Sequence, residues 1–251
     1  INKINSYKFS KLENFNQFDF EPLILSNGVI VFEKKGTIIR FNDNKKVIWK
    51  KNFYSKTEKK IHPSLSFAIT DKNLLVADSI AKISSIDLQN GDLIWSKKSE
   101  YPFNSEIKIH KDKFFVADFK NTLRCFYLKD GSECWNIKTE ESFTVSNSKF
   151  SILIRDNLVI YNNSLGDITA IDISSGLIEW QLPTQKSSII NETYSFNFSK
   201  LVSDGKSIYF SNNKNQFYSV DLTSGTTNWM SEINSILTPI IVGNLIFTVS
   251  E

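Results

Sequence analysis

The residues of this chain that could carry chemistry are two histidines and three aspartates at a repeated position. His62 and His110 are far apart in the sequence, and neither has a second ligand at the spacing of a metal site. We therefore expect both to be loop or surface histidines. Asp87, Asp172 and Asp221 could act as general acids or bases, but each precedes a tryptophan by eight positions. Carboxylates that recur at one motif position rarely converge on one substrate, so we expect turn-capping roles and predict no catalytic residue.

The two cysteines flank one predicted turn. If Leu128 to Gly131 form the loop of a hairpin, Tyr127 faces Ser132 and Cys125 falls opposite Cys134. Such a pair reaches disulfide geometry only at a favourable cross-strand site. Two interpretations stay open, a disulfide and a pair of small core residues.

Composition argues against several functional classes. The sequence has no glycine-rich phosphate loop, nucleophile elbow or HExxH motif. Of its 30 basic residues nearly all are lysine, and arginine, the usual choice for bidentate phosphate recognition, occurs only at Arg40, Arg124 and Arg155. We expect a solvated lysine surface and no nucleic-acid partner. No apolar run approaches the roughly 20 residues of a membrane helix, so no transmembrane segment is predicted in this chain.

The tryptophans reveal an internal repeat. All five close similar segments, and they are separated by 46, 40, 45 and 49 residues. Four of them follow a glycine by four positions, whereas Lys45 occupies that position before the first. The tryptophans are Trp49, Trp95, Trp135, Trp180 and Trp229, and the glycines are Gly91, Gly131, Gly176 and Gly225.

Each segment between the aspartate and the glycine predicts a tight hairpin turn. Glycine tolerates the positive φ that such a turn needs, and the aspartate carboxylate accepts hydrogen bonds from free backbone N–H groups. In the other two units Phe41 and Tyr127 replace the aspartate. The predicted turn residues are Asp87, Gly91, Gly131, Asp172, Gly176, Asp221 and Gly225. A short β-branched or aromatic run, such as VIVF at Val29, stands about 20 residues before each tryptophan and predicts a strand.

Four short antiparallel strands in each period, without helical periodicity, predict an all-β fold made of β-propeller blades. We expect one propeller domain over 1–251, with about five complete blades and a partial one. The approximate blade ranges are 20–55, 62–100, 103–140, 148–184, 196–233 and, for the partial blade, 236–251. The first residue is Ile, and the last predicted blade stops inside a strand run, so we expect a fragment truncated from a ring of seven or eight blades.

The ending Asp-x-x-(Ser/Thr/Asn)-Gly-x-x-x-Trp resembles the PQQ-like, quinoprotein-type repeat of bacterial β-propellers, over nearly the whole chain from Pro22 to Glu251. In that family the tryptophan packs against the neighbouring blade, and the resemblance implies this role for all five tryptophans here. One branch consists of dehydrogenases that hold pyrroloquinoline quinone (PQQ) and calcium. These enzymes carry a disulfide between adjacent cysteines, which this chain lacks, so we expect no cofactor, with PQQ and calcium as the alternative.

The other branch is noncatalytic and includes BamB, a periplasmic lipoprotein of the machinery that assembles outer-membrane β-barrels. The resemblance implies a protein-binding scaffold, a BamA-type barrel assembly subunit as partner, and a periplasmic, outer-membrane-associated location with a lipid-anchored parent. By loose alignment, the candidate partner-binding residues are Phe143, Val145, Tyr194 and Phe196. Those residues equally suit buried starts of inner strands. A dehydrogenase fragment and the sensor ectodomain of a receptor are the competing hypotheses.

Overall fold

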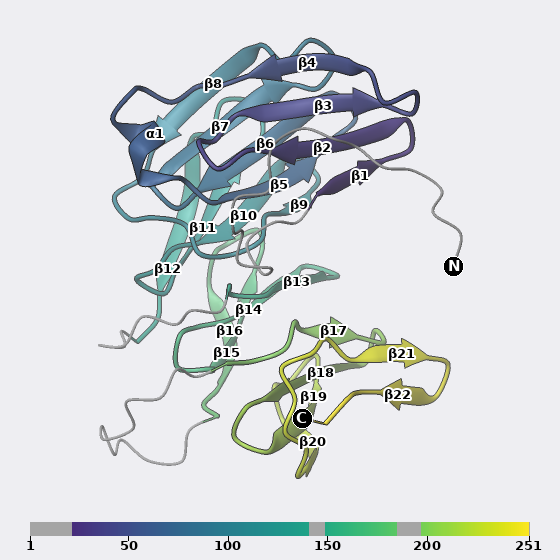
Figure 1. The fold of residues 1–251 in the computed structure, drawn as a ribbon. Helices are drawn as coiled ribbons and strands as arrows, with labels where there is room; N and C mark the ends of the chain where they lie inside the picture. The colour runs from purple at the N-terminus through teal and green to yellow at the C-terminus, as the bar shows by residue number, and fades with distance from the viewer. Residues whose placement is uncertain (1–21, 141–148, 185–196, 251) are drawn as a thin grey trace. The chain divides into compact units, whose positions relative to one another are not determined.

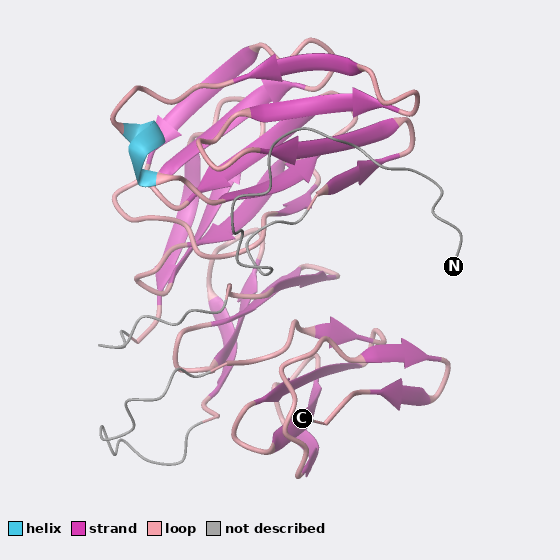
Figure 2. Ribbon diagram, viewed as in Figure 1, coloured by secondary structure: helices cyan, strands magenta, loops and turns pink. Residues whose placement is uncertain are grey.

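The computed structural model describes residues 22–140, 149–184 and 197–250 (Figure 1). These residues form five four-stranded antiparallel sheets, one two-stranded sheet and the single short helix α1 (Glu58–Ile61), as Figure 2 shows. In every sheet, neighbouring strands are also consecutive along the chain. This confirms the all-β fold class with five complete blades and a partial one.

The chain divides into two compact units, Ile1–Phe103 and Asn104–Glu251. The prediction of one domain over residues 1–251 therefore stays a prediction. The N-terminal unit holds the first two sheets: β1 (Leu23–Leu25), β2 (Gly28–Phe32), β3 (Ile38–Asn42) and β4 (Val47–Lys51), then β5 (Leu65–Ile69), β6 (Asn73–Asp78), β7 (Lys82–Asp87) and β8 (Leu93–Lys98).

The C-terminal unit holds the remaining sheets. The third comprises β9 (Lys108–His110), β10 (Lys113–Ala117), β11 (Thr122–Tyr127) and β12 (Glu133–Lys138). The fourth comprises β13 (Ile152–Arg155), β14 (Leu158–Asn162), β15 (Ile168–Asp172) and β16 (Ile178–Leu182). The fifth comprises β17 (Val202–Ser203), β18 (Ser207–Asn212), β19 (Gln216–Asp221) and β20 (Thr227–Ser231), and the two-stranded sheet comprises β21 (Ile240–Val242) and β22 (Leu245–Phe247).

The core lies between successive sheets of one unit, because the second and third strands of each sheet are buried on both faces. Continuous apolar runs such as GVIVF in β2 and LVIYN in β14 supply these strands. Apolar clusters join the first sheet to the second, the third to the fourth, and the fourth to the fifth; pairs that represent them are Ile30 with Leu74, Phe115 with Tyr161, and Ile160 with Ile208. Of the described residues, none belongs to a helix with the length and apolar character that crossing a membrane requires.

A β-bulge recurs in the fourth strand of every complete sheet, directly before the tryptophan. The register between the third and fourth strands shifts there by one residue, for example between the pairs Cys125↔Trp135 and Phe126↔Glu133. The residues skipped by the pairing are Ile48, Ile94, Cys134, Glu179 and Asn228. The expectation that Cys125 pairs directly with Cys134 is therefore wrong, because an unbulged hairpin was assumed. Cys134 is the extra residue, and Trp135 pairs with Cys125.

Candidate functional site

Tryptophans at the end of one sheet bond to the next sheet of the same unit. The indole N–H of Trp49 donates to the carbonyl of Leu88 at 3.0 Å. Trp135 donates to Ile173 and Trp180 to Leu222, each at 3.1 Å. In all three cases the accepting carbonyl belongs to the residue that follows the aspartate position of the next repeat. We call each of these contacts between an indole and the next sheet a joint. The repeat motif thus carries both the donor of one joint and the acceptor of another.

The motif glycines lie against the same indoles. A Cβ atom built on Gly91 would approach Trp49 to 2.7 Å, one on Gly176 would approach Trp135 to 2.7 Å, and one on Gly225 would approach Trp180 to 2.5 Å. Their φ angles are 74°, 74° and 71°. Glycine is therefore needed for two reasons, the left-handed backbone of the turn and the room that the neighbouring indole takes. The sequence indicated only the first.

The three motif aspartates cap the hairpin turns with one oxygen each. Oδ1 of Asp172 accepts hydrogen bonds from the backbone N–H groups of Ser174 at 3.0 Å and Ser175 at 2.7 Å. Asp87 and Asp221 accept the same pair of bonds from the second and third residues after them. The bonds from Ser175 hold the pKa of the Asp172 carboxyl below its ordinary value, and those from Ser224 do the same for Asp221. All three carboxylates act as turn caps.

The first and third sheets, which lack the motif aspartate, close their hairpins differently. In the first sheet the turn is one residue shorter, and Asn42 supplies the cap, since its Oδ1 accepts from the N–H of Lys46 at 2.9 Å. Lys45 takes the left-handed position at φ 61°. In the third sheet a disulfide between Cys125 and Cys134, with 5.3 Å between their Cα atoms, joins the strands, and Oδ1 of Asp130 in the turn accepts from the N–H of Ser132 at 2.9 Å. Of the two interpretations left open by the sequence, the structure has the disulfide.

Burial of the tryptophans varies along the chain. Trp49 and Trp180 are buried, and Trp95 and Trp135 are half-buried. Trp229 departs from the expected position between sheets, because 41% of it is exposed and its ring neighbours are Phe217 and Tyr209 of its own sheet. Within the described part of the chain, no carbonyl accepts its indole N–H.

A second set of turn caps was not predicted from the sequence. The turn after the second strand of four sheets is closed by a buried aspartate or asparagine whose Oδ1 accepts backbone N–H groups: Asp78, Asp118, Asn163 and Asn212. The strings VAD, VAD, YNN and SNN at these strand ends are the signal that could have found them.

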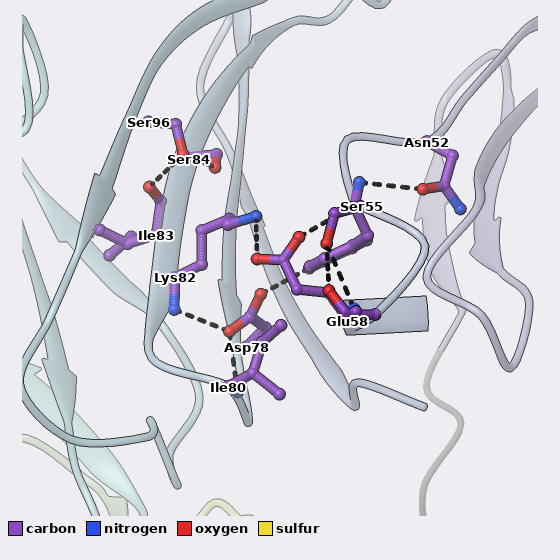
Figure 3. A network of polar contacts seen from close by, with 11 residues as sticks. Asn52, Ser55, Glu58, Asp78, Ile80, Lys82, Ile83, Ser84 and Ser96 are labelled. Atoms are coloured by element: carbon purple, nitrogen blue, oxygen red, sulfur yellow. Dashed lines mark hydrogen bonds and ion pairs between the residues drawn. The ribbon is translucent and has the colours of Figure 1, made fainter. Parts of the chain in front are cut away.

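Asp78 is also the centre of a polar cluster that fixes the link between β4 and β5 (Figure 3). Its Oδ2 accepts from the hydroxyl of buried Tyr54 at 2.6 Å, while its Oδ1 accepts from the N–H groups of Ile80 and Lys82. The Lys82 ammonium bonds to Glu58 of α1 at 2.8 Å. Burial raises the pKa of Asp78 and of Tyr54, whereas bonds from Lys82 and Ser55 lower the pKa of Glu58 to about 2.

The described residues offer no assembled metal centre. Among them, no group of three or more His, Cys, Asp or Glu side chains lies close enough to hold a metal ion. His62 is exposed at the end of α1, and His110 is half-buried in β9. The cysteines are nine residues apart and bonded across a hairpin, unlike the adjacent pair of the dehydrogenases. Phe143, Val145, Tyr194 and Phe196 lie outside the described residues.

Solved structures with this fold include BamB, a designed protein and an alcohol dehydrogenase. BamB from Moraxella catarrhalis is 17% identical with a TM-score of 0.76, over 92% of this chain and 69% of its own. The computationally designed Ika8 protein is 11% identical with a TM-score of 0.69, over 90% and 65%. The quinohemoprotein alcohol dehydrogenase ADHIIG from Pseudomonas putida HK5 is 14% identical with a TM-score of 0.64, over 84% and 41%. At these identities the likeness shows the fold alone.

Sequence comparison is more specific than the fold. Among curated protein sequences, none matches the chain. A family model described as outer membrane protein assembly factor BamB matches residues 26–251, which include every strand of the described residues except β1. The chain therefore belongs to the PQQ_2 family of β-propellers, the family of the outer membrane protein assembly factor BamB.

Proposed function

We propose that the chain is a noncatalytic β-propeller scaffold that acts, like BamB, in the assembly and insertion of β-barrel proteins into the outer membrane. In this proposal it works in the periplasm of a Gram-negative bacterium, attached to the outer membrane through a lipid-anchored parent. Its partner is the BamA-type barrel assembly subunit. Membership of the family supports the proposal, and so does the similarity in fold to BamB from Moraxella catarrhalis.

The observation that carries the proposal is the use of the repeated residues. Three motif tryptophans donate to carbonyls of the neighbouring sheet, three motif glycines leave room for those indoles, and the three motif aspartates accept from backbone N–H groups of the turns. Side chains that only hold sheets together are suited to a rigid scaffold. Partner contacts then fall to the links between sheets and to the exposed fourth strands.

The fourth strands offer apolar contacts for a partner. Val47 and Ile48 in the first sheet and Leu93 and Ile94 in the second are each 43 to 52% exposed. They directly precede a motif tryptophan that pairs with the third strand of its own sheet, at Arg40↔Trp49 and Ser85↔Trp95. Exposed aliphatic side chains on a rigid strand are suited to a protein interface.

The test is a capture experiment with the full-length parent protein in the bacterium that encodes it. We expect crosslinking followed by affinity purification to recover the barrel assembly subunit, with an unrelated periplasmic protein as the bait control. Recovery of no barrel assembly subunit would contradict the proposal. A quinone absorbance band together with calcium-dependent alcohol oxidation would support the dehydrogenase alternative.

A further inference from the structure

The loops at one end of the N-terminal unit carry five lysines that have no acidic partner among the residues the structure describes. Three segments meet there: the turn 33–37 between β2 and β3, the link 52–64 between β4 and β5, and the turn 78–82 between β6 and β7. The lysines are Lys34, Lys35, Lys56, Lys59 and Lys60, and we call them the lysine platform. Lys59 is half-exposed and the other four are exposed. None of the five forms an ion pair within the described part of the chain.

Contacts between the segments show that they belong to one surface. The side-chain amide of Asn52 donates to the carbonyl of Lys35 at 3.1 Å and to the hydroxyl of Thr37 at 2.9 Å, which ties the link to the first turn. A Cβ atom on Gly36 would approach the Tyr54 ring to 2.5 Å, so that ring lies directly on the turn. Tyr54 in turn bonds to Asp78 at the third segment.

Every acidic residue in these segments is already engaged. Glu33 pairs with Lys50 at 2.9 Å, and Glu58 pairs with Lys82 at 2.8 Å. Asp78 is buried and bonded to Tyr54 and to two backbone N–H groups. The platform lysines are thus left without local compensation, and they keep a positive surface on a chain whose total net charge is only +3.

The platform is held in place rather than carried on a loose loop. Glu58 Oε2 accepts from the N–H of Ser55 at 2.7 Å, and its other oxygen holds Lys82, so both ends of the carboxylate fix α1 (Figure 3). The Lys82 ammonium also lies 4.8 Å from the centre of the Tyr54 ring. Lysines at fixed separations pay less ordering entropy on binding, and they favour a partner whose negative charges are also fixed.

We propose that the lysine platform is a docking surface for an acidic segment of a protein partner. A membrane surface is the less suitable occupant, since the platform offers one large exposed apolar side chain, Ile61 at 63%, and interfacial anchoring needs a broader apolar face. This inference rests on the proposed scaffold function and adds to it the chemistry of the partner.

The test measures binding of the full chain to a fluorescein-labelled peptide of alternating Glu and Ser, by fluorescence anisotropy at low salt. We expect the triple variant Lys34→Gln, Lys56→Gln, Lys60→Gln to bind about tenfold more weakly, from three exposed ion pairs. The matched control is Lys72→Gln, Lys111→Gln, Lys129→Gln, which removes the same charge from exposed turns outside the platform and should leave the affinity unchanged. Far-UV circular dichroism checks that both variants are folded.

Two outcomes would overturn the inference. Equal weakening in the platform and control variants would mean that only net charge matters. Binding to phosphatidylglycerol vesicles without binding to the peptide would assign the platform to lipid. Failure to capture the barrel assembly subunit while the peptide still binds through the platform would contradict the proposed assembly role alone.

Discussion

At the scale of single residues, each joint depends on one indole and one glycine from successive repeats. The indole N–H supplies a directed bond to a carbonyl, and the glycine leaves the space in which the ring lies. A buried aromatic ring contributes much of its stabilisation through area, and the hydrogen bond satisfies its polar atom. Substitution of either the tryptophan or the glycine should therefore destabilise the contact between the two sheets.

Gly176→Ala tests the glycine half of the joint. Its Cβ would lie 2.7 Å from the Trp135 ring, so we expect a loss of about 1 to 3 kcal/mol in the free energy of unfolding beyond the cost of the turn backbone. Gly243→Ala is the matched control, because Gly243 also has a positive φ, at 58°, but has no neighbouring atom within 4 Å. Urea denaturation of both variants measures the difference. Equal losses would show that the turn conformation alone requires glycine.

At the scale of elements, the hairpins before the tryptophans close by three chemical routes. Three use an aspartate cap, one uses Asn42 in a shorter turn, and the third sheet combines Tyr127 with a disulfide. The bulge makes the disulfide feasible, since it adds Cys134 beside Cys125 without moving Trp135 from its place in the ladder. The covalent bond lies in the sheet that has Tyr127 in place of the motif aspartate.

The roles of the disulfide and the aspartate cap can be tested by exchanging one for the other in the third sheet. We expect Cys125→Ala with Cys134→Ala to lower the free energy of unfolding by about 2 to 3 kcal/mol. Adding Tyr127→Asp should restore on the order of 1 kcal/mol, because a carboxylate at the motif position can accept backbone N–H groups of the turn. Thermal denaturation under nonreducing conditions gives both values. No recovery on adding the aspartate would contradict the exchange.

The anchor of α1 should be sensitive to pH. The folded state lowers the pKa of Glu58 from 4.5 to about 2, so the unfolded chain takes up the proton first as the pH falls. The stabilisation is complete above pH 4.5 and is lost between 4.5 and about 2. Glu58→Gln should therefore be less stable than wild type by about 1 kcal/mol or less at neutral pH, with solvent screening of the pair, and equal to it near pH 2.

Urea denaturation across that pH range measures the difference between the two proteins. The raised pKa of Asp78 acts in the opposite direction, but it is common to both and cancels. A difference that stays constant down to pH 2 would show that Glu58 acts through packing instead of charge.

The elements were largely predictable from the sequence, and the joints were not. The apolar runs and the Gly-to-Trp spacing were enough for the strands and the hairpins, because both depend on local backbone preference. The bulge, the contact of Gly176 with Trp135 and the buried cap Asp78 depend on which strand lies opposite, and a single sequence does not contain that register. The same bulge shifts the register, so that Cys125 pairs with Trp135 and not with Cys134.

At the scale of the whole molecule, stability should be a sum of sheets and the joints between neighbours. Trp180→Ala removes a buried ring and its bond to Leu222, which should cost about 3 to 5 kcal/mol. We expect hydrogen exchange measured by mass spectrometry to show faster exchange in the fourth and fifth sheets and unchanged exchange in the first. Trp229→Ala, which changes a half-exposed ring, is the control and should have a smaller effect. Uniform acceleration throughout the chain would contradict local coupling.

The placement of donor and acceptor in each joint also bears on how such a chain changes length. A complete repeat brings its own indole for the repeat that follows, together with the glycine and carbonyl that receive the indole before it. Copying one whole repeat in the gene therefore adds both halves at once and leaves the flanking contacts chemically unaltered. A duplication of any other length separates an indole from the glycine and carbonyl that it contacts. We therefore expect such chains to gain or lose whole repeats.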